Sequence, residues 1–119
     1  MDGDELCQIT ADHSCVAVLV AAGKIRPDEV YTYPQRNIIT RCLGTQPDIE
    51  VDLFTKVLQP GSSLLLCSDG LWEMVRDNEI REVALKTKSA QFACEKLVEE
   101  ANKNGGVDNV SVIIVKITK

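Results

Sequence analysis

The sequence predicts an α+β fold in which antiparallel strands are flanked by helices. A continuous apolar run at residues 63–67 and a β-branched run at residues 110–117 predict two strands. Between them, residues 90–101 carry apolar side chains at i, i+3, i+4 and i+7, the spacing of a helix that packs on one face. The expected order is strand, helices, strand, strand, helices, strand. Because strands and helices do not alternate singly, this order favours an α+β layout over a parallel sheet.

The first half of the chain is expected to hold short elements. These are a turn at residues 2–5, a strand at 6–10, a helix at 15–22, a short helix from residue 27, and a helix at 34–44. Asp12 or Ser14 can cap the helix at 15–22, and Gly23 can end it in the left-handed conformation. The turn interpretation includes Asp2, which no apolar strand precedes.

The second half gives stronger signals. Residues 49–54 alternate with period two, which predicts a strand with one wet face. The run at 63–67 does not alternate, which suits a strand buried on both faces. Asp77 and Ser89 are expected to cap two helices, the first running to about residue 86 and the second ending at Gly105.

Composition excludes several classes of protein. The 119 residues carry a net charge of -5, which argues against nucleic acid or an anionic membrane as a partner. The length predicts a single domain over residues 1–119. No apolar run is long enough to span a bilayer, and the start of the chain is acidic, so a cytoplasmic protein is expected. The five cysteines are widely spaced, which fits reduced, mostly buried thiols better than a zinc site.

The most informative feature is a pair of acidic turns at strand ends. Asp69 and Gly70 follow the apolar run at 63–67, and Asp108 directly precedes the β-branched run. Carboxylates delivered by the ends of buried strands suit a hard divalent cation such as Mg²⁺ or Mn²⁺, which prefers oxygen ligands on rigid elements. Two carboxylates alone do not complete such a site.

Five blocks in order carry a resemblance to a known family. They are Asp12-His13-Ser14, Leu19-Val20 with Gly23-Lys24-Ile25, residues 34–44 (PQRNIITRCLG), residues 64–71 (LLLCSDGL) and residues 105–112 (GGVDNVSV). Together they resemble the C-terminal half of the metal-dependent serine/threonine protein phosphatases of type 2C, bacterial branch. The resemblance implies a partial β-sandwich with flanking helices, two Mg²⁺ or Mn²⁺ ions, and hydrolysis of phosphoserine and phosphothreonine in phosphoproteins by a metal-activated water.

The resemblance also assigns residues to the metal site. It implies that Asp69 and Asp108 are metal ligands, with Gly70 adjacent to them. Glu73 lies where the family often has an acid near a weaker metal site, although the preference of acids for helix starts explains it better than a ligand role does.

A flap is implied over residues 25–40. Within or beside it, Arg36, Asn37 and Arg41 could contact substrate, or could make local hydrogen bonds only. His13 is the only histidine and is expected to have a structural role at a helix start. No catalytic side chain is assigned, because the resemblance covers none of the phosphate-binding or proton-donating positions.

The family's N-terminal motifs have no counterpart in the sequence. These include the Asp that bridges the two metals, so we expect a C-terminal fragment that is inactive or nearly so, with weak metal occupancy. Two alternatives stay open. The chain could be a non-catalytic protein-binding module built on the phosphatase scaffold, or it could complete a sandwich by self-association or by pairing with an N-terminal half.

Overall fold

The computed structural model describes residues 1–118, which form two compact units. Unit 1 comprises Met1–Cys7 and residues 56–118, and unit 2 comprises Gln8–Thr55. A single domain over residues 1–119 stays a prediction, because compact units can belong to one cooperatively folding domain. Among the described residues, no helix has both the length and the apolar character needed to cross a membrane.

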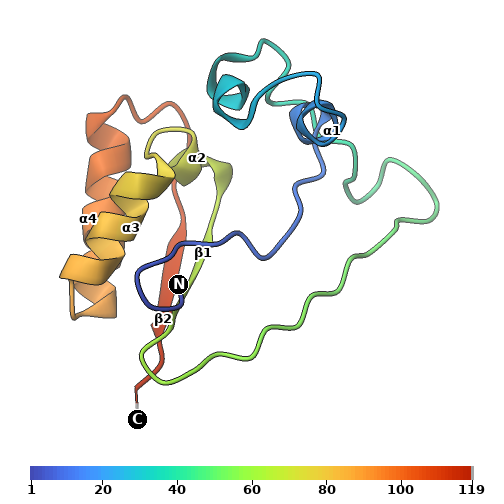
Figure 1. Ribbon diagram of the computed structural model, residues 1–119. Helices are drawn as coiled ribbons and strands as arrows, with labels where there is room; N and C mark the ends of the chain where they lie inside the picture. The colour runs from blue at the N-terminus through green and yellow to red at the C-terminus, as the bar shows by residue number, and fades with distance from the viewer. Residues whose placement is uncertain (119) are drawn as a thin grey trace. The chain divides into compact units, whose positions relative to one another are not determined.

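Unit 1 is built on a two-stranded antiparallel sheet. Strand β1 (Ser63–Cys67) pairs with β2 (Val112–Lys116), and the register places Leu65 opposite Ile114 (Figure 1). Both strands lie where the apolar runs predict them, although β2 is shorter than the run at 110–117. β-branched residues stack well on a pleated surface, which explains why the last run of the chain is extended.

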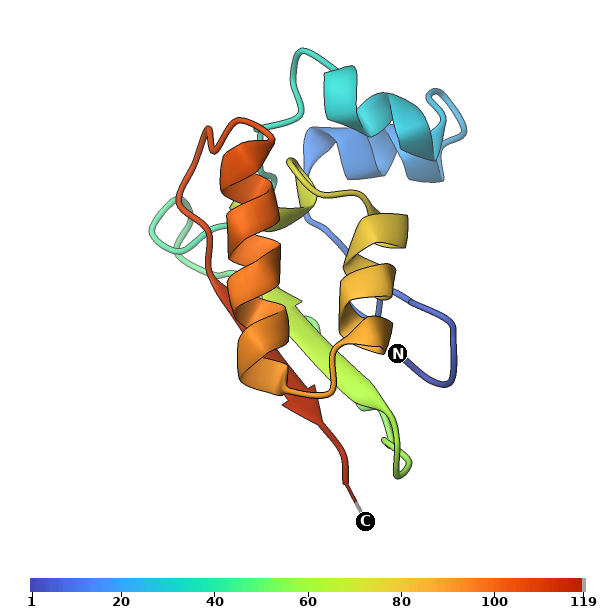
Figure 2. The same cartoon turned by 90° about the vertical axis from the view of Figure 1, so that its left-hand side faces the viewer.

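Three helices of unit 1 cover one face of this sheet (Figure 2). They are α2 (Asp69–Trp72), α3 (Asp77–Lys86) and α4 (Ala90–Lys103). Ser89 caps α4 as predicted, because its side chain accepts the backbone N–H of Phe92. The predicted N-cap of α3, Asp77, is wrong by one residue, because Arg76 is the N-cap. The backbone N–H of Arg76 donates to the Glu79 side chain.

The core of unit 1 forms where the helices meet the sheet. Leu71, Val75 and Leu97 are fully buried, and each contributes about 1.5–3 kcal/mol by leaving water. On the sheet side, Leu65 and Ile114 pack against this cluster. The predicted helical stripe at residues 90–101 is therefore confirmed as the surface that binds α4 to the sheet.

The opposite face of the sheet is open, so the prediction that residues 63–67 are buried on both faces is wrong. Leu66 is 49% exposed, and its cross-strand partner Ile113 is 60% exposed. The physical reason is that the helices cover one face only and no second layer comes from the described residues. The five cysteines are free, as expected, but the expectation that most are buried is wrong, because Cys7 and Cys67 are exposed and the other three are only partly buried.

Unit 2 holds two short helices, α1 (Cys15–Ala21) and the 3-10 helix η1 (Pro27–Thr32). Ser14 caps α1 by accepting the N–H of Ala17, and Gly23 follows it with a φ of 71°, as predicted. Unit 2 has almost no apolar interior, since Val16 is the single buried residue among residues 8–55.

Three predicted elements are wrong. Residues 34–44 form turns and bends in place of the predicted helix. Within this range, Ile38–Thr40 is extended and pairs with residues 13–15. The N–H of Cys15 donates to Ile38 O at 3.0 Å, and the N–H of Thr40 donates to His13 O at 2.8 Å. Residues 6–10 and 49–54 are not strands. Each is short and finds no strand partner among the described residues, and isolated strands are not stable in water.

We expect Leu97→Ala to destabilise the chain by about 2–5 kcal/mol, because it leaves a cavity at the centre of the unit 1 core. Phe92→Ala, on the same helix but at a position 54% exposed, is the matched control and should change stability by no more than about 0.5 kcal/mol. Urea unfolding followed by circular dichroism measures both. Equal effects of the two substitutions would contradict the assigned core.

Candidate metal-binding site

The two acidic segments predicted from the sequence lie side by side in unit 1, but the predicted Asp-Gly turn is wrong, because Asp69 and Gly70 begin helix α2. We call residues 68–70 and 107–109 the acidic turns. Beyond the ends of β1 and β2, the N–H of Ser68 donates to Ser111 O at 3.0 Å, which extends the strand pairing by one step. The Ser68 hydroxyl donates to Asn109 O at 3.3 Å and accepts the N–H of Ser111 at 3.0 Å. Ser68 therefore binds the turn that carries Asp69 to the turn that carries Asp108.

Gly70 allows these turns to approach closely. A Cβ atom at this position would lie 2.1 Å from Asn109 O and 3.0 Å from Asn109 C, both atoms of the backbone. No side chain fits at such distances without moving one turn away from the other. Gly70 is buried, and its role beside the two acidic residues is to bring their turns into contact.

Both carboxylates are on exposed residues. Asp69 is the first residue of α2 and is exposed. Asp108 is exposed as well, and its Oδ1 accepts the N–H of Asn109 at 2.7 Å, which orients the carboxylate on its own turn. Carboxylate oxygens on adjoining, hydrogen-bonded turns are the kind of ligand that Mg²⁺ and Mn²⁺ prefer.

The donor set fits part of a divalent-cation site. No group of three or more His, Cys, Asp or Glu side chains able to hold a metal occurs among residues 1–118. Glu73 is half-buried at the end of α2, and its N–H donates to Asp69 O at 3.0 Å, so it lies one helical turn beyond Asp69. The described residues thus bring the segments of Asp69 and Asp108 together but offer no complete set of metal ligands.

Asp2 is held in the predicted turn. Residues 2 and 5 form an isolated bridge, and Gly3 between them has a φ of 59°. The Asp2 carboxylate accepts the hydroxyl of Ser62 at 2.6 Å and pairs with Lys56 at 3.5 Å. The Ser62 hydrogen bond, followed by Lys56, lowers the pKa of the Asp2 carboxyl.

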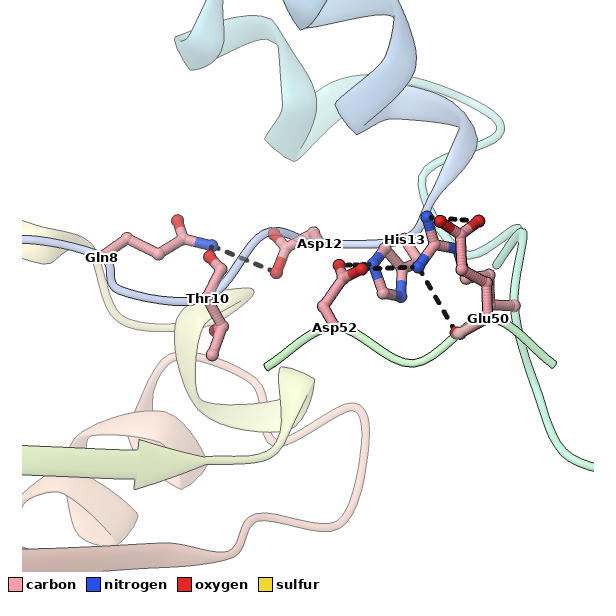
Figure 3. Close-up of polar contacts among 7 residues, drawn as sticks. Gln8, Thr10, Asp12, His13, Glu50 and Asp52 are labelled. Carbon is pink, nitrogen blue, oxygen red and sulfur yellow. Dashed lines mark hydrogen bonds and ion pairs between the residues drawn. The ribbon is translucent and has the colours of Figure 1, made fainter. Parts of the chain in front are cut away.

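The candidate flap residues of unit 2 make local contacts. Arg36 Nη1 donates to Tyr33 O at 3.4 Å, and Asn37 is exposed. Arg41 Nη1 donates to Asp52 Oδ1 at 3.0 Å, and His13 Nε2 lies 2.6 Å from the other Asp52 oxygen (Figure 3). His13 thus has the structural role expected, through Asp52 and not as a helix cap.

Sequence reasoning missed Asp52 as a binding partner of these residues. Arg41, and then His13, lower the pKa of its carboxyl by hydrogen bonding to the ionised form. The available signal was the alternation at residues 49–54, which placed Asp52 on a wet face but gave no indication of which cations it would meet.

The arrangement of unit 1 is similar to that of solved serine/threonine phosphatases. The chain is 41% identical to Stp1 of Staphylococcus aureus, with a TM-score of 0.93 over 99% of this chain and 47% of that one. It is 34% identical to a PstP catalytic domain solved in complex with two manganese ions, with a TM-score of 0.80 over 97% of this chain and 46% of that one.

Comparison of sequences gives the same class. The phosphatase PhpP of Streptococcus pneumoniae is 40% identical over 117 residues, which cover 98% of this chain and 48% of PhpP. Residues 1–118 match the family model of Stage II sporulation protein E (SpoIIE), and the chain belongs to that family. The chain spans about half the length of the curated relatives that it matches. The phosphatase resemblance seen in the motifs is thereby confirmed, while the assignment to a C-terminal half stays a prediction.

We expect Gly70→Ala to separate the two acidic turns and to destabilise the chain by about 1–3 kcal/mol, the usual cost of overpacking. The amide resonances of Asn109 and Ser111 should shift, because the new methyl group displaces the Asn109 carbonyl. Heteronuclear NMR and urea unfolding measure the two effects. Unchanged resonances at these positions would show that the turns are not in contact.

Proposed function

We propose that this chain contributes metal ligands to a Mg²⁺- or Mn²⁺-dependent protein phosphatase that hydrolyses phosphoserine and phosphothreonine. The observation that carries the proposal is the contact between the two acidic turns, in which Ser68 and Gly70 hold Asp69 next to the turn of Asp108. The similarity to phosphatases over nearly the whole chain supports the same class of reaction.

Asp69 and Asp108 would hold the cation in this function. The chemistry that a divalent cation brings to phosphate-ester hydrolysis is activation of water and neutralisation of phosphoryl oxygens. The chain's own contribution is to keep two carboxylate side chains at one end of the sheet, on segments that are joined by the hydrogen bonds of Ser68. The assignment of Glu73 as an additional metal ligand has less support, because its side chain is half-buried at the end of α2.

We further propose that residues 1–118 correspond to the C-terminal half of the type 2C catalytic domain, with the flap at residues 25–40. The order of the motifs and the share of the relatives that is covered support this proposal. Because the described residues offer two carboxylates and no third ligand, the chain alone should bind cations weakly and have little or no activity.

Titration with Mn²⁺ tests the ligand assignment. Paramagnetic broadening should appear first at the amides of residues 69–71 and 107–109, at millimolar Mn²⁺. The double substitution Asp69→Asn, Asp108→Asn should raise the Mn²⁺ concentration for half-broadening at least about tenfold, because both charges are lost. Asp77→Asn removes an exposed acid from the start of α3 and is the matched control.

Broadening that is equal in the double variant and in Asp77→Asn would contradict the ligand assignment. Hydrolysis of a phosphothreonine peptide by the same samples tests the expected inactivity. Mn²⁺-dependent turnover that disappears in Asp69→Asn would show that the missing ligands are supplied, for example by a second copy of the chain.

A second candidate is supported by the open face of the sheet. The exposed cross-strand pair Leu66 and Ile113, with Val115 at 41% exposure, forms an apolar surface of the kind that packs against another sheet. In this proposal the chain is half of a β-sandwich that is completed by another copy or by a separate N-terminal half, or it serves as a non-catalytic protein-binding module.

We expect Leu66→Thr with Ile113→Thr to reduce self-association of the chain, because the substitutions make the open face more polar and introduce a β-branched residue that suits a strand. Analytical ultracentrifugation over a range of concentrations measures the change. Phe92→Thr, which lies at an exposed position of α4, is the control. A parent chain that is monomeric at every concentration would exclude the self-association form of this candidate.

A further inference from the structure

We propose that Asp52 is an electrostatic latch that holds together three segments of unit 2, and that its release loosens these segments while unit 1 stays folded. The segments are the residues before α1, the residues after the turns at 34–40, and the extended stretch around residue 52 (Figure 3). Loss of the Asp52 charge, or of its partners, opens the latch.

Each of the two carboxylate oxygens of Asp52 contacts a different partner. One carboxylate oxygen, Oδ2, lies 2.6 Å from His13 Nε2, and the other, Oδ1, lies 3.0 Å from Arg41 Nη1. Because an ionised carboxylate can only accept, the His13 Nε2 must carry the hydrogen, which both the imidazolium ion and one neutral tautomer provide. The three side chains are 29–30% exposed, so water screens the contacts only in part.

Arg41 extends the latch to a further residue. Its Nη2 lies 3.6 Å from the Glu50 carboxylate, and its Nη1 is 3.4 Å from Glu50 O. The guanidinium therefore binds the stretch at 50–52 through both side chain and backbone. A planar group with several donors suits such a contact better than a single ammonium.

Unit 2 depends on this latch because it lacks an apolar core. Val16 is its single buried residue, whereas Ile49, Val51 and Leu53 are exposed. Residues 49–55 form no regular structure, so packing does not hold them in place. The backbone bonds between Cys15 and Ile38 and between Thr40 and His13 lie directly beside the latch residues His13 and Arg41, and they should report its state.

The latch should open in acid. Arg41 and His13 face the Asp52 carboxylate directly, and Glu50 faces it through Arg41. Hydrogen bonds from Arg41, and then from His13, hold the pKa of the Asp52 carboxyl below its ordinary value of 3.8. A lowered folded-state pKa means that the contribution to stability is fully present above pH 3.8 and is lost as the pH falls through the folded-state value.

Hydrogen exchange of the whole chain at pH 6–7 tests the latch. We expect Asp52→Asn to accelerate exchange of the Cys15 and Thr40 amides about three- to tenfold, as expected for loss of coupled, half-exposed ion pairs. The amides of Leu66 and Ile113, a hydrogen-bonded pair in the sheet of unit 1, should keep their rates. Asp48→Asn is the matched control, because it removes the same charge from an exposed position four residues away.

A second pair of variants separates the latch from a general loss of charge. Arg41→Gln should accelerate exchange of the Cys15 and Thr40 amides as much as Asp52→Asn does. Arg41→Lys should give rates between those of Arg41→Gln and the parent, because it keeps the positive charge but loses the planar guanidinium with its several donors. Equal exchange at Cys15 and Thr40 in Asp52→Asn and Asp48→Asn would overturn the proposal. Loss of protection at Leu66 and Ile113 in Asp52→Asn would overturn it as well, because the effect of Asp52 then would not be confined to unit 2.

Discussion

The antiparallel pairing of β1 with β2 is the constraint on which the rest of unit 1 depends. These strands are separated in the chain by α2, α3 and α4, and their register brings the residues just beyond them together. The turn that carries Asp69 meets the turn that carries Asp108 because each follows or precedes one of the paired strands. The burial of Leu97 and Leu71 on the inner face of the sheet keeps this register, since a slip of one residue would exchange the two faces.

The two units are stabilised by different kinds of interaction. Unit 1 has an apolar core, and its candidate site is a rigid consequence of strand pairing. Unit 2 has one buried residue, two short helices and a network of charges around Asp52. Apolar burial is insensitive to pH and strengthened by salts such as sulfate, whereas half-exposed ion pairs are screened by salt and respond to titration. Solution conditions should therefore change unit 2 more than unit 1.

The face of the sheet opposite the helices of unit 1 is apolar and exposed to solvent. Leu66 and Ile113 lie opposite each other on the side that no helix covers, and apolar surface of this kind favours contact with a further layer. The two faces of the same sheet therefore differ in how far their side chains are buried. Leu65 and Ile114 are packed against helices, while their neighbours in sequence face solvent. Period-two alternation alone does not reveal this difference when every residue of the run is apolar.

Local sequence determined the elements whose signals lie within one turn or one strand. Ser14 and Ser89 cap helices because a hydroxyl three residues before a free N–H can accept it, and the apolar run at 63–67 is the strand that it predicts. The same signals placed both candidate metal ligands. Only the tertiary structure decided what depends on distant partners: the turns at residues 34–44, the unpaired stretch at 49–54, and the meeting of Asp52 with His13 and Arg41. A strand or an ion pair needs a second segment, and the sequence does not state which segment that will be.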